Sequence, residues 1–318
     1  MDHSILSIIQ QALLPSAFVI VLGVIWRHTE PGGVSFVEVR RIIGLLVINL
    51  FYPALIIAVI PSVALSSELI SAPLLFNAGI LAGMALCLLL KPYLTRIGMG
   101  KPELAVLILA CAYANIISLG VPLLRAEQGE AAARFAIYVD VLAISPMLWI
   151  VGVWIASRWS DADNGDGSLR SFIKTFLSLP PIWAFVFAVF LNITQLELPQ
   201  FIQTSVRMLG DTTMHAMLLA VGMSLSISSL LRYWRISLIA SVIKLALVPA
   251  VVFGLGVATL GTDSEAMKST VLLAATPTMM ATLVLSERFG LNTELLATIL
   301  VSSTALFFVS LPLWLWVL

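Results

Sequence analysis

Long apolar stretches separated by short polar segments run through the whole chain. A helix needs about 20 apolar residues to cross a bilayer core of about 30 Å. Ten such stretches can be read along the sequence, and we expect each to be a membrane-spanning helix. The first five are roughly 5–26, 42–61, 72–94, 104–124 and 132–156, and the last five are roughly 182–193, 201–228, 236–260, 267–285 and 295–318.

The most hydrophilic tract, Ser157 to Leu169, lies between the fifth and sixth stretches and is rich in aspartate and glycine. Such composition is typical of a loop. We expect a cytoplasmic linker over 157–179 between two halves, residues 1–156 and 180–318. Because each half has an odd number of spans, the halves would insert with opposite orientations, which is the inverted-repeat plan of many transporters.

Lysine and arginine are distributed unequally between the two sides of these spans. The richer side carries Arg27, Arg40, Arg41, Lys91, Arg96, Lys101, Arg158, Arg170, Lys174, Arg232, Arg235 and Arg288, and the other side carries Arg125, Arg134 and Lys268. Cytoplasmic loops carry the excess of basic residues. We therefore expect a multi-pass protein of the cell inner (plasma) membrane with both termini outside the cytoplasm.

Composition agrees with a membrane protein. The chain is 60% hydrophobic and 11% charged with a mean hydropathy of +1.06, whereas soluble proteins are about 45–50% apolar and about 25% charged. Its formal net charge is zero, so nothing favours nucleic acid as a partner. The start has no basic residue before the first stretch, so we expect a mature helix and not a signal peptide. Cys87 and Cys111 lie in apolar stretches and are expected to be small packing residues.

Two predicted spans contain a proline at matching places in the two halves. The fourth contains Ala114 to Leu124, where we expect Gly120 and Pro122 to break the helix, and the ninth contains Pro277. Proline removes a backbone donor, and carbonyls freed in hydrocarbon must find partners. Either proline alone is an ordinary kink. The matched pair favours a transporter binding site built from broken helices.

Polar but uncharged residues surround these prolines. Helix N-termini carry partial positive charge and free amides, and amide and hydroxyl side chains add directional hydrogen bonds, so the arrangement suits an anion such as a carboxylate. No metal or cofactor is expected. The predicted substrate-binding residues are Asn115, Ser118, Gly120, Pro122, Thr276, Pro277 and Thr278.

A few charged residues lie inside predicted spans, where charge is costly. In the seventh span Arg207, Asp211 and His215 share a helix face, so Arg207 is expected to pair with Asp211 as a structural charge. His215 either titrates near neutral pH and is a candidate for proton coupling, or serves as a packing histidine. Asp140, in the fifth span, either carries a coupling proton or holds the bundle together. Lys244, in the eighth, is read as a structural charge, and its contact with Asp140 stays open.

These motifs resemble the auxin efflux carrier family, which includes plant PIN-type transporters. The fourth span reads Asn115-Ile-Ile-Ser-Leu-Gly-Val-Pro-Leu-Leu and matches the family's pattern of Asn, four variable residues, Gly, one variable residue and Pro. Further similarity lies in Ala274-Ala-Thr-Pro-Thr, Ser286-Glu-Arg-Phe-Gly-Leu-Asn, Leu209-Gly-Asp, Leu219-Ala-Val-Gly-Met-Ser-Leu and Pro180-Pro181.

The resemblance implies an all-α membrane fold of ten helices, arranged as two inverted five-helix repeats like those of bile-acid transporters and sodium/proton antiporters. The fourth and ninth helices would be broken and would cross. The first, second, sixth and seventh would form a scaffold that mediates a homodimer, and the other six a transporter domain. Small organic anions would be held near the crossing by Asn115 and the two prolines. The sequence departs from the family at His215, where many bacterial members have proline.

Sequence and resemblance together predict a transporter, and not an enzyme, for a small mono- or dicarboxylate. It would be secondary-active or facilitative, since no ATP-binding motif is present, and would act as an exporter by an elevator-type mechanism. One alternative is a proton- or sodium-coupled symporter or antiporter on the same fold. Another is a membrane-embedded substrate sensor. The lipid bilayer is the expected surrounding partner.

Overall fold

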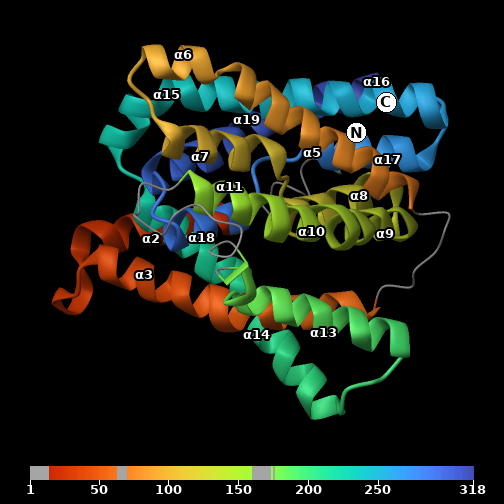
Figure 1. The fold of residues 1–318 in the computed structure, drawn as a ribbon, viewed down its shortest axis with the longest axis horizontal. Helices are drawn as coiled ribbons and strands as arrows, with labels where there is room; N and C mark the ends of the chain where they lie inside the picture. The colour runs from red at the N-terminus through yellow and green to blue at the C-terminus, as the bar shows by residue number, and fades with distance from the viewer. Residues whose placement is uncertain (1–13, 63–69, 160–172, 175) are drawn as a thin grey trace.

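The computed structural model describes residues 14–62, 70–159, 173–174 and 176–318, and all regular structure in them is helical (Figure 1). The start of the first predicted span and most of the aspartate-rich linker lie outside these residues. In the first half the helices are α2 (Leu14–Thr29), α3 (Phe36–Leu46), α4 (Tyr52–Val59), α5 (Ser71–Leu89), α6 (Lys91–Arg96), α7 (Lys101–Ala112), α8 (Val121–Gln128), α9 (Glu130–Val139), α10 (Ser145–Met147) and α11 (Val153–Arg158). In the second half they are α13 (Pro180–Thr194), α14 (Gln200–Ser224), α15 (Ile227–Val242), α16 (Val248–Leu260), α17 (Glu265–Ala274), α18 (Ala281–Arg288) and α19 (Thr293–Val317).

Five helical runs are long and apolar enough to cross a membrane, namely Phe36–Val59, Ser71–Arg96, Ala132–Arg158, Ile227–Leu260 and Thr293–Val317. Two shorter apolar helices, Ala17–Thr29 and Pro180–Thr194, accompany them. The run from Ile227 begins nine residues before the predicted eighth span, because a helix can continue beyond the apolar core through residues such as Arg232 and Arg235. The predicted fourth and ninth spans are each divided into two helices.

Four helices contain a wide turn directly before a proline. The π-helical turns Val47–Phe51, Ile116–Gly120, Asp140–Ile144 and Ile243–Leu247 each end two residues before Pro53, Pro122, Pro146 or Pro249. Proline cannot donate a hydrogen bond to the carbonyl four residues back, and its ring crowds that carbonyl. The amide just before the proline bonds five residues back instead, as Val248 does to Ile243, so the helix widens and continues.

The expected break at Gly120 and Pro122 is therefore wrong in position. Gly120 has helical backbone angles, and Pro122 lies in the first turn of α8. The helix is interrupted earlier, where Tyr113 takes up an extended conformation after α7 ends. Pro122 is accommodated by the π turn before it, so the interruption depends on other contacts, described below.

The helices pack in two groups. In one group α14 lies against α2 and α4, and α13 lies against α4. In the other group α5 packs against α7, α16 and α17, and α15 packs against α19. Figure 1 shows α3, α13 and α14 together in the lower part of the view and α15, α16 and α19 at the top. Where the groups meet, α14 contacts α18 and α19, and α3 contacts α18.

The pair α2 and α14 is joined through glycines. A Cβ atom on Gly23 would lie 2.8 Å from the Cα of Gly222, and one on Gly222 would overlap the carbonyl oxygen of Ile20. Small residues of this kind let helix backbones approach closely, which is a main source of helix association in membranes. Both positions consequently require glycine.

We predict that Gly222→Ala lowers the unfolding temperature of the purified protein by about 5 °C, because the added methyl group forces the two backbones apart. Gly254→Ala in α16 is the matched control, since a Cβ there meets nothing within 4 Å. Thermal unfolding in detergent measures both variants. Equal unfolding temperatures for the two would contradict the tight contact between α2 and α14.

Candidate functional site

Two interrupted helices meet near the centre of the molecule. The extended residues after α7 lie antiparallel to those after α17, with Ala114 facing Thr278. The amide of Asn115 donates to the carbonyl of Pro277 at 2.9 Å, and the amide of Met279 donates to the carbonyl of Tyr113 at 3.0 Å. We call this pairing of Tyr113–Asn115 with Ala275–Met280 the crossover.

Side chains satisfy the carbonyl groups that the interruptions leave free. The hydroxyl of Thr278 donates to the carbonyl of Ala110 at 2.9 Å, and the hydroxyl of Thr276 donates to that of Leu273 at 2.8 Å. Because unpaired backbone groups are very costly away from water, these bonds stabilise the crossover. Both hydroxyl groups are thereby engaged in holding the backbone.

A cavity of about 520 Å³ lies beside the crossover, between α4 and α14. Its lining mixes apolar and polar side chains, a composition that suits a small organic molecule. The polar, aromatic and thioether members are Tyr52, Asn115, Ser118, Asp140, Ser145, Asp211, Thr213, Met214, His215, Met217, Met279 and Met280.

Three residues of this lining each have a buried polar atom with no hydrogen-bond partner among the described residues. The atoms are the amide nitrogen Nδ2 of Asn115, the carboxyl oxygen Oδ1 of Asp140 and the hydroxyl oxygen Oγ1 of Thr213, whose residues are 5%, 8% and 2% exposed. Buried polar groups are normally paired. Unpaired buried polar atoms on three residues that line the same cavity therefore make it the candidate site for a ligand.

The predicted substrate-binding residues divide into two sets. Asn115, Ser118 and Pro122 line the cavity, whereas Gly120, Thr276, Pro277 and Thr278 do not and lie within or behind the crossover. Gly120 is buried against α17, where a Cβ would lie 2.7 Å from the side chain of Leu273. Its small size lets the two interrupted helices pack together.

The predicted ion pair of Arg207 with Asp211 is absent from the described residues. Arg207 lines a separate cavity of about 330 Å³ with Glu197 and Gln203. Asp211 and His215 both line the main cavity, and the His215 ring nitrogen Nδ1 lies 3.0 Å from the carbonyl oxygen of Asp211. Helical spacing places the three residues on one face, but it does not fix where a long arginine side chain points.

Asp140 and Lys244, whose contact the sequence left open, also form no ion pair in the described part of the chain. Lys244 donates to the carbonyl of Ala274 at 2.6 Å, while Asp140 faces the cavity. Each lies in one of the π turns that precede a proline. Tyr52 also lines the cavity, and its only signal in the sequence is its place directly before Pro53.

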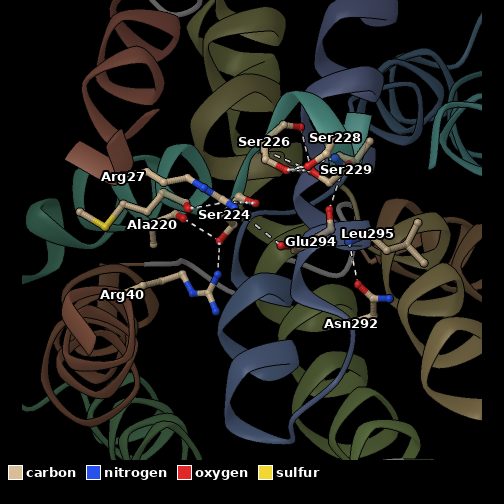
Figure 2. Close-up of polar contacts among 12 residues, drawn as sticks. Arg27, Arg40, Ala220, Ser224, Ser226, Ser228, Ser229, Asn292, Glu294 and Leu295 are labelled. Atoms are coloured by element: carbon tan, nitrogen blue, oxygen red, sulfur yellow. Dashed lines mark hydrogen bonds and ion pairs between the residues drawn. The ribbon is translucent and has the colours of Figure 1, made fainter. Parts of the chain in front are cut away.

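An arginine cluster joins the two helix groups at the C-terminal end of α14. Arg40 Nε lies 2.6 Å from Glu287 Oε1, and Arg27 Nη2 lies 3.8 Å from Glu294 Oε1. Figure 2 shows Arg27 and Arg40 converging on Ser224, where Arg27 donates to the Ser224 carbonyl at 3.2 Å. These contacts tie α2, α3 and the end of α14 to α18 and α19.

The cavity and the arginine cluster lie at different levels along the same helices. Along α14 the cavity is lined by residues 210–217, and the cluster lies at Ser224. Along the second predicted span the cavity is lined by Tyr52 to Ile60, and the cluster lies at Arg40. The cavity is thus displaced toward the side opposite the cluster.

Interrupted helices that pair at their breaks, beside a cavity lined by polar groups, are typical of membrane transport proteins. A family model described as "Membrane transport protein" matches residues 7–315. The chain belongs to this family, the auxin efflux carrier family that its motifs indicated. It is a multi-pass membrane protein of a family of transporters.

Two relatives are archaeal proteins described as uncharacterized transporters. One, from Methanocaldococcus jannaschii, is 25% identical over 311 residues, which cover 94% of this chain and 96% of the relative. The other, from Methanothermobacter thermautotrophicus, is 27% identical over 308 residues, which cover 96% of each chain. The similarity extends over nearly the full length and names no substrate.

We predict that a cysteine placed at Met214 in the cavity reacts with a membrane-impermeant maleimide added to intact spheroplasts. Ser224→Cys, fully buried at the arginine cluster, is the matched control and should stay unlabelled. The native Cys87 and Cys111 are buried and give a low background. A Met214→Cys protein that reacts only after the membrane is permeabilised would contradict the predicted side on which the cavity opens.

Proposed function

We propose that the protein is a secondary-active or facilitative transporter, acting as an exporter, of a small organic anion such as a mono- or dicarboxylate. The observation that carries the proposal is the unpaired Nδ2 donor of Asn115, buried in the wall of the cavity. A carboxylate oxygen is the kind of acceptor that satisfies such a donor. The Ser118 side chain beside it offers a second donor, and the apolar side chains suit a hydrocarbon body.

The two packing groups support a division into a scaffold and a moving domain. In this proposal ten helices form two inverted repeats, with α2, α3, α4, α13 and α14 as the scaffold and the remaining helices as the transporter domain. The scaffold helices expose large apolar side chains, such as Phe18, Trp183 and Phe190, and would mediate a homodimer. An elevator-type movement would carry the crossover past α4 and α14.

The arginine cluster supports an assignment to one transport state. On the predicted orientation it lies on the cytoplasmic side, where the pair of Arg40 with Glu287 would hold the transporter domain against the scaffold. The cavity then faces outward. Opening to the cytoplasm requires these contacts to separate, and the membrane potential favours export of an anion by about 2.3 kcal/mol per charge per 100 mV.

We predict that Asn115→Ala weakens substrate affinity about tenfold, because it removes a buried hydrogen bond to a charged acceptor. A thermal-shift screen of small organic acids on the purified protein identifies the ligand, and flux in proteoliposomes then measures its affinity. Asn49→Ala is the control, since Asn49 is exposed and away from the cavity.

Unchanged affinity in Asn115→Ala would remove Asn115 from the site and the proposal with it. Binding without flux in the wild-type protein would favour a substrate sensor over a transporter. Both outcomes are read from the same set of proteoliposomes.

A proton-coupled transporter is a second candidate, favoured by Asp140. A buried carboxyl group in the wall of a cavity that receives an anion creates like-charge repulsion unless the carboxyl is protonated. Asp140 lines that cavity, and its buried oxygen Oδ1 has no hydrogen-bond partner among the described residues. Anion and proton would then bind together.

On this second candidate, Asp140→Asn abolishes the response of flux to a pH gradient, because asparagine cannot release a proton. Asp211→Asn, which lies in the same cavity but is exposed, should keep the response. Flux in proteoliposomes under imposed pH gradients measures both. A wild-type flux that ignores the gradient would rule out proton coupling and leave the facilitative transporter.

A further inference from the structure

Lys244 lies deep in the protein with no acidic partner among the described residues. Its side chain is 1% exposed, and its ammonium group donates to the backbone carbonyl of Ala274 at 2.6 Å. A charge buried in this way requires a compensating partner or a purpose. The partner is a helix end and not a carboxylate.

Ala274 is the last residue of α17, at the point where this helix is interrupted. The carbonyl groups at the C-terminus of a helix carry partial negative charge and lack intrahelical donors. In the last turn of α17, the Val271 carbonyl accepts from the amide of Ala275, and the Leu273 carbonyl accepts from Thr276. The Ala274 carbonyl accepts from Lys244.

The end of the other interrupted helix packs against the helical segment that carries Lys244. Cys111 lies in the last turn of α7, a helix that contacts the π turn Ile243–Leu247. Its thiol contacts the carbonyl of Ala240, one turn before Lys244 on the same helix. The C-terminal end of α17 thus binds the ammonium group, and the C-terminal end of α7 packs against the same helical segment one turn earlier.

Pro249 explains how the lysine reaches this place. It forces the π turn Ile243–Leu247, which includes Lys244. The wide turn packs against α5, α7 and α19 in the centre of one helix group. A π turn changes the direction of the side chains that follow it, so the lysine position depends on the proline.

In transporters built from broken helices, unwound carbonyls and the C-terminal ends of half-helices are where coupling cations such as sodium bind. We infer that Lys244 is a built-in cation of the crossover, whose ammonium group occupies the place of a bound alkali-metal ion. The protein then needs no sodium or potassium ion to fold its crossover or to transport. The statement about transport rests on the proposed function, whereas the statement about folding of the crossover does not.

The test is thermal unfolding of purified Lys244→Ala in buffers that differ only in their cation. In choline chloride the variant should unfold about 5 °C below the wild-type protein, since the helix end loses its partner. Ethylammonium, which is small enough to enter the space left by the side chain, should restore at least half of that loss in a saturable manner. Sodium should also restore part of it.

Two comparisons separate charge from general damage. Lys244→Gln keeps a hydrogen-bond donor but not the charge, so it should remain less stable than the wild type in choline chloride. Lys268→Ala, a partly exposed lysine in the first turn of α17, should show no response to the choice of cation. A wild-type protein that unfolds at the same temperature in sodium and choline completes the expected pattern.

The inference is overturned if Lys244→Ala is as stable as the wild type, or if neither small cation restores more than choline does. If the neutral variants do not fold, the comparison of wild-type unfolding temperatures in sodium and in choline tests the inference by itself. If the stability or the flux of the wild-type protein requires sodium, the inference that Lys244 replaces a bound metal ion is wrong. Sodium-dependent flux of an organic anion would still agree with the proposed substrate class. Flux that is absent in every buffer counts against the proposed function and not against the role of Lys244 in stability.

Discussion

The structure depends on one constraint, the need of backbone polar groups for partners in an apolar surrounding. Two helices stop in the middle of the molecule, and each stop frees carbonyl and amide groups. The two extended segments satisfy each other through the bonds of Asn115 to Pro277 and Met279 to Tyr113. The side chains of Thr276 and Thr278 in the crossover, and of Lys244 in the π turn before α16, bind further carbonyl groups at the helix ends. The interruptions are therefore stable only as a pair, which explains why they occur at matching places in the two halves.

The same constraint separates structural groups from groups left free for a ligand. The hydroxyls of Thr276 and Thr278 are used on helix ends. The side chains of Asn115 and Asp140 keep one polar atom each without a partner beside the cavity. Prolines contribute indirectly, because the π turns before Pro146 and Pro249 contain Asp140 and Lys244. The wide turns before these prolines thus contain both buried charged residues, of which Asp140 lines the cavity and Lys244 binds a helix end.

Much of the architecture followed from the sequence, because apolar runs and prolines act locally. The all-helical membrane class, the family and the interruption of the fourth and ninth stretches could be predicted, and five of the predicted spans correspond to long apolar helical runs. The exact place of the interruption in the fourth span could not be predicted. Pro122 is accommodated by a π turn, and Tyr113–Asn115 contains no proline or glycine that would indicate a break. Contacts between distant residues were also missed, such as Lys244 with Ala274 and Arg40 with Glu287. The prediction that Arg207 pairs with Asp211 was wrong for a related reason. Helical spacing brings two residues within reach of each other, but it does not determine the conformation of a long side chain.

The central claim is that the cavity beside the crossover takes up an organic anion without an added metal cation. Transient currents from proteoliposomes on a solid-supported membrane test it most directly, with the organic acid applied in sodium-free choline buffer. The account predicts a saturable current with the sign of negative charge entering the proteoliposomes, unchanged when sodium replaces choline. A protein that gives no current with any organic acid in either buffer, or a current only in sodium, would contradict it.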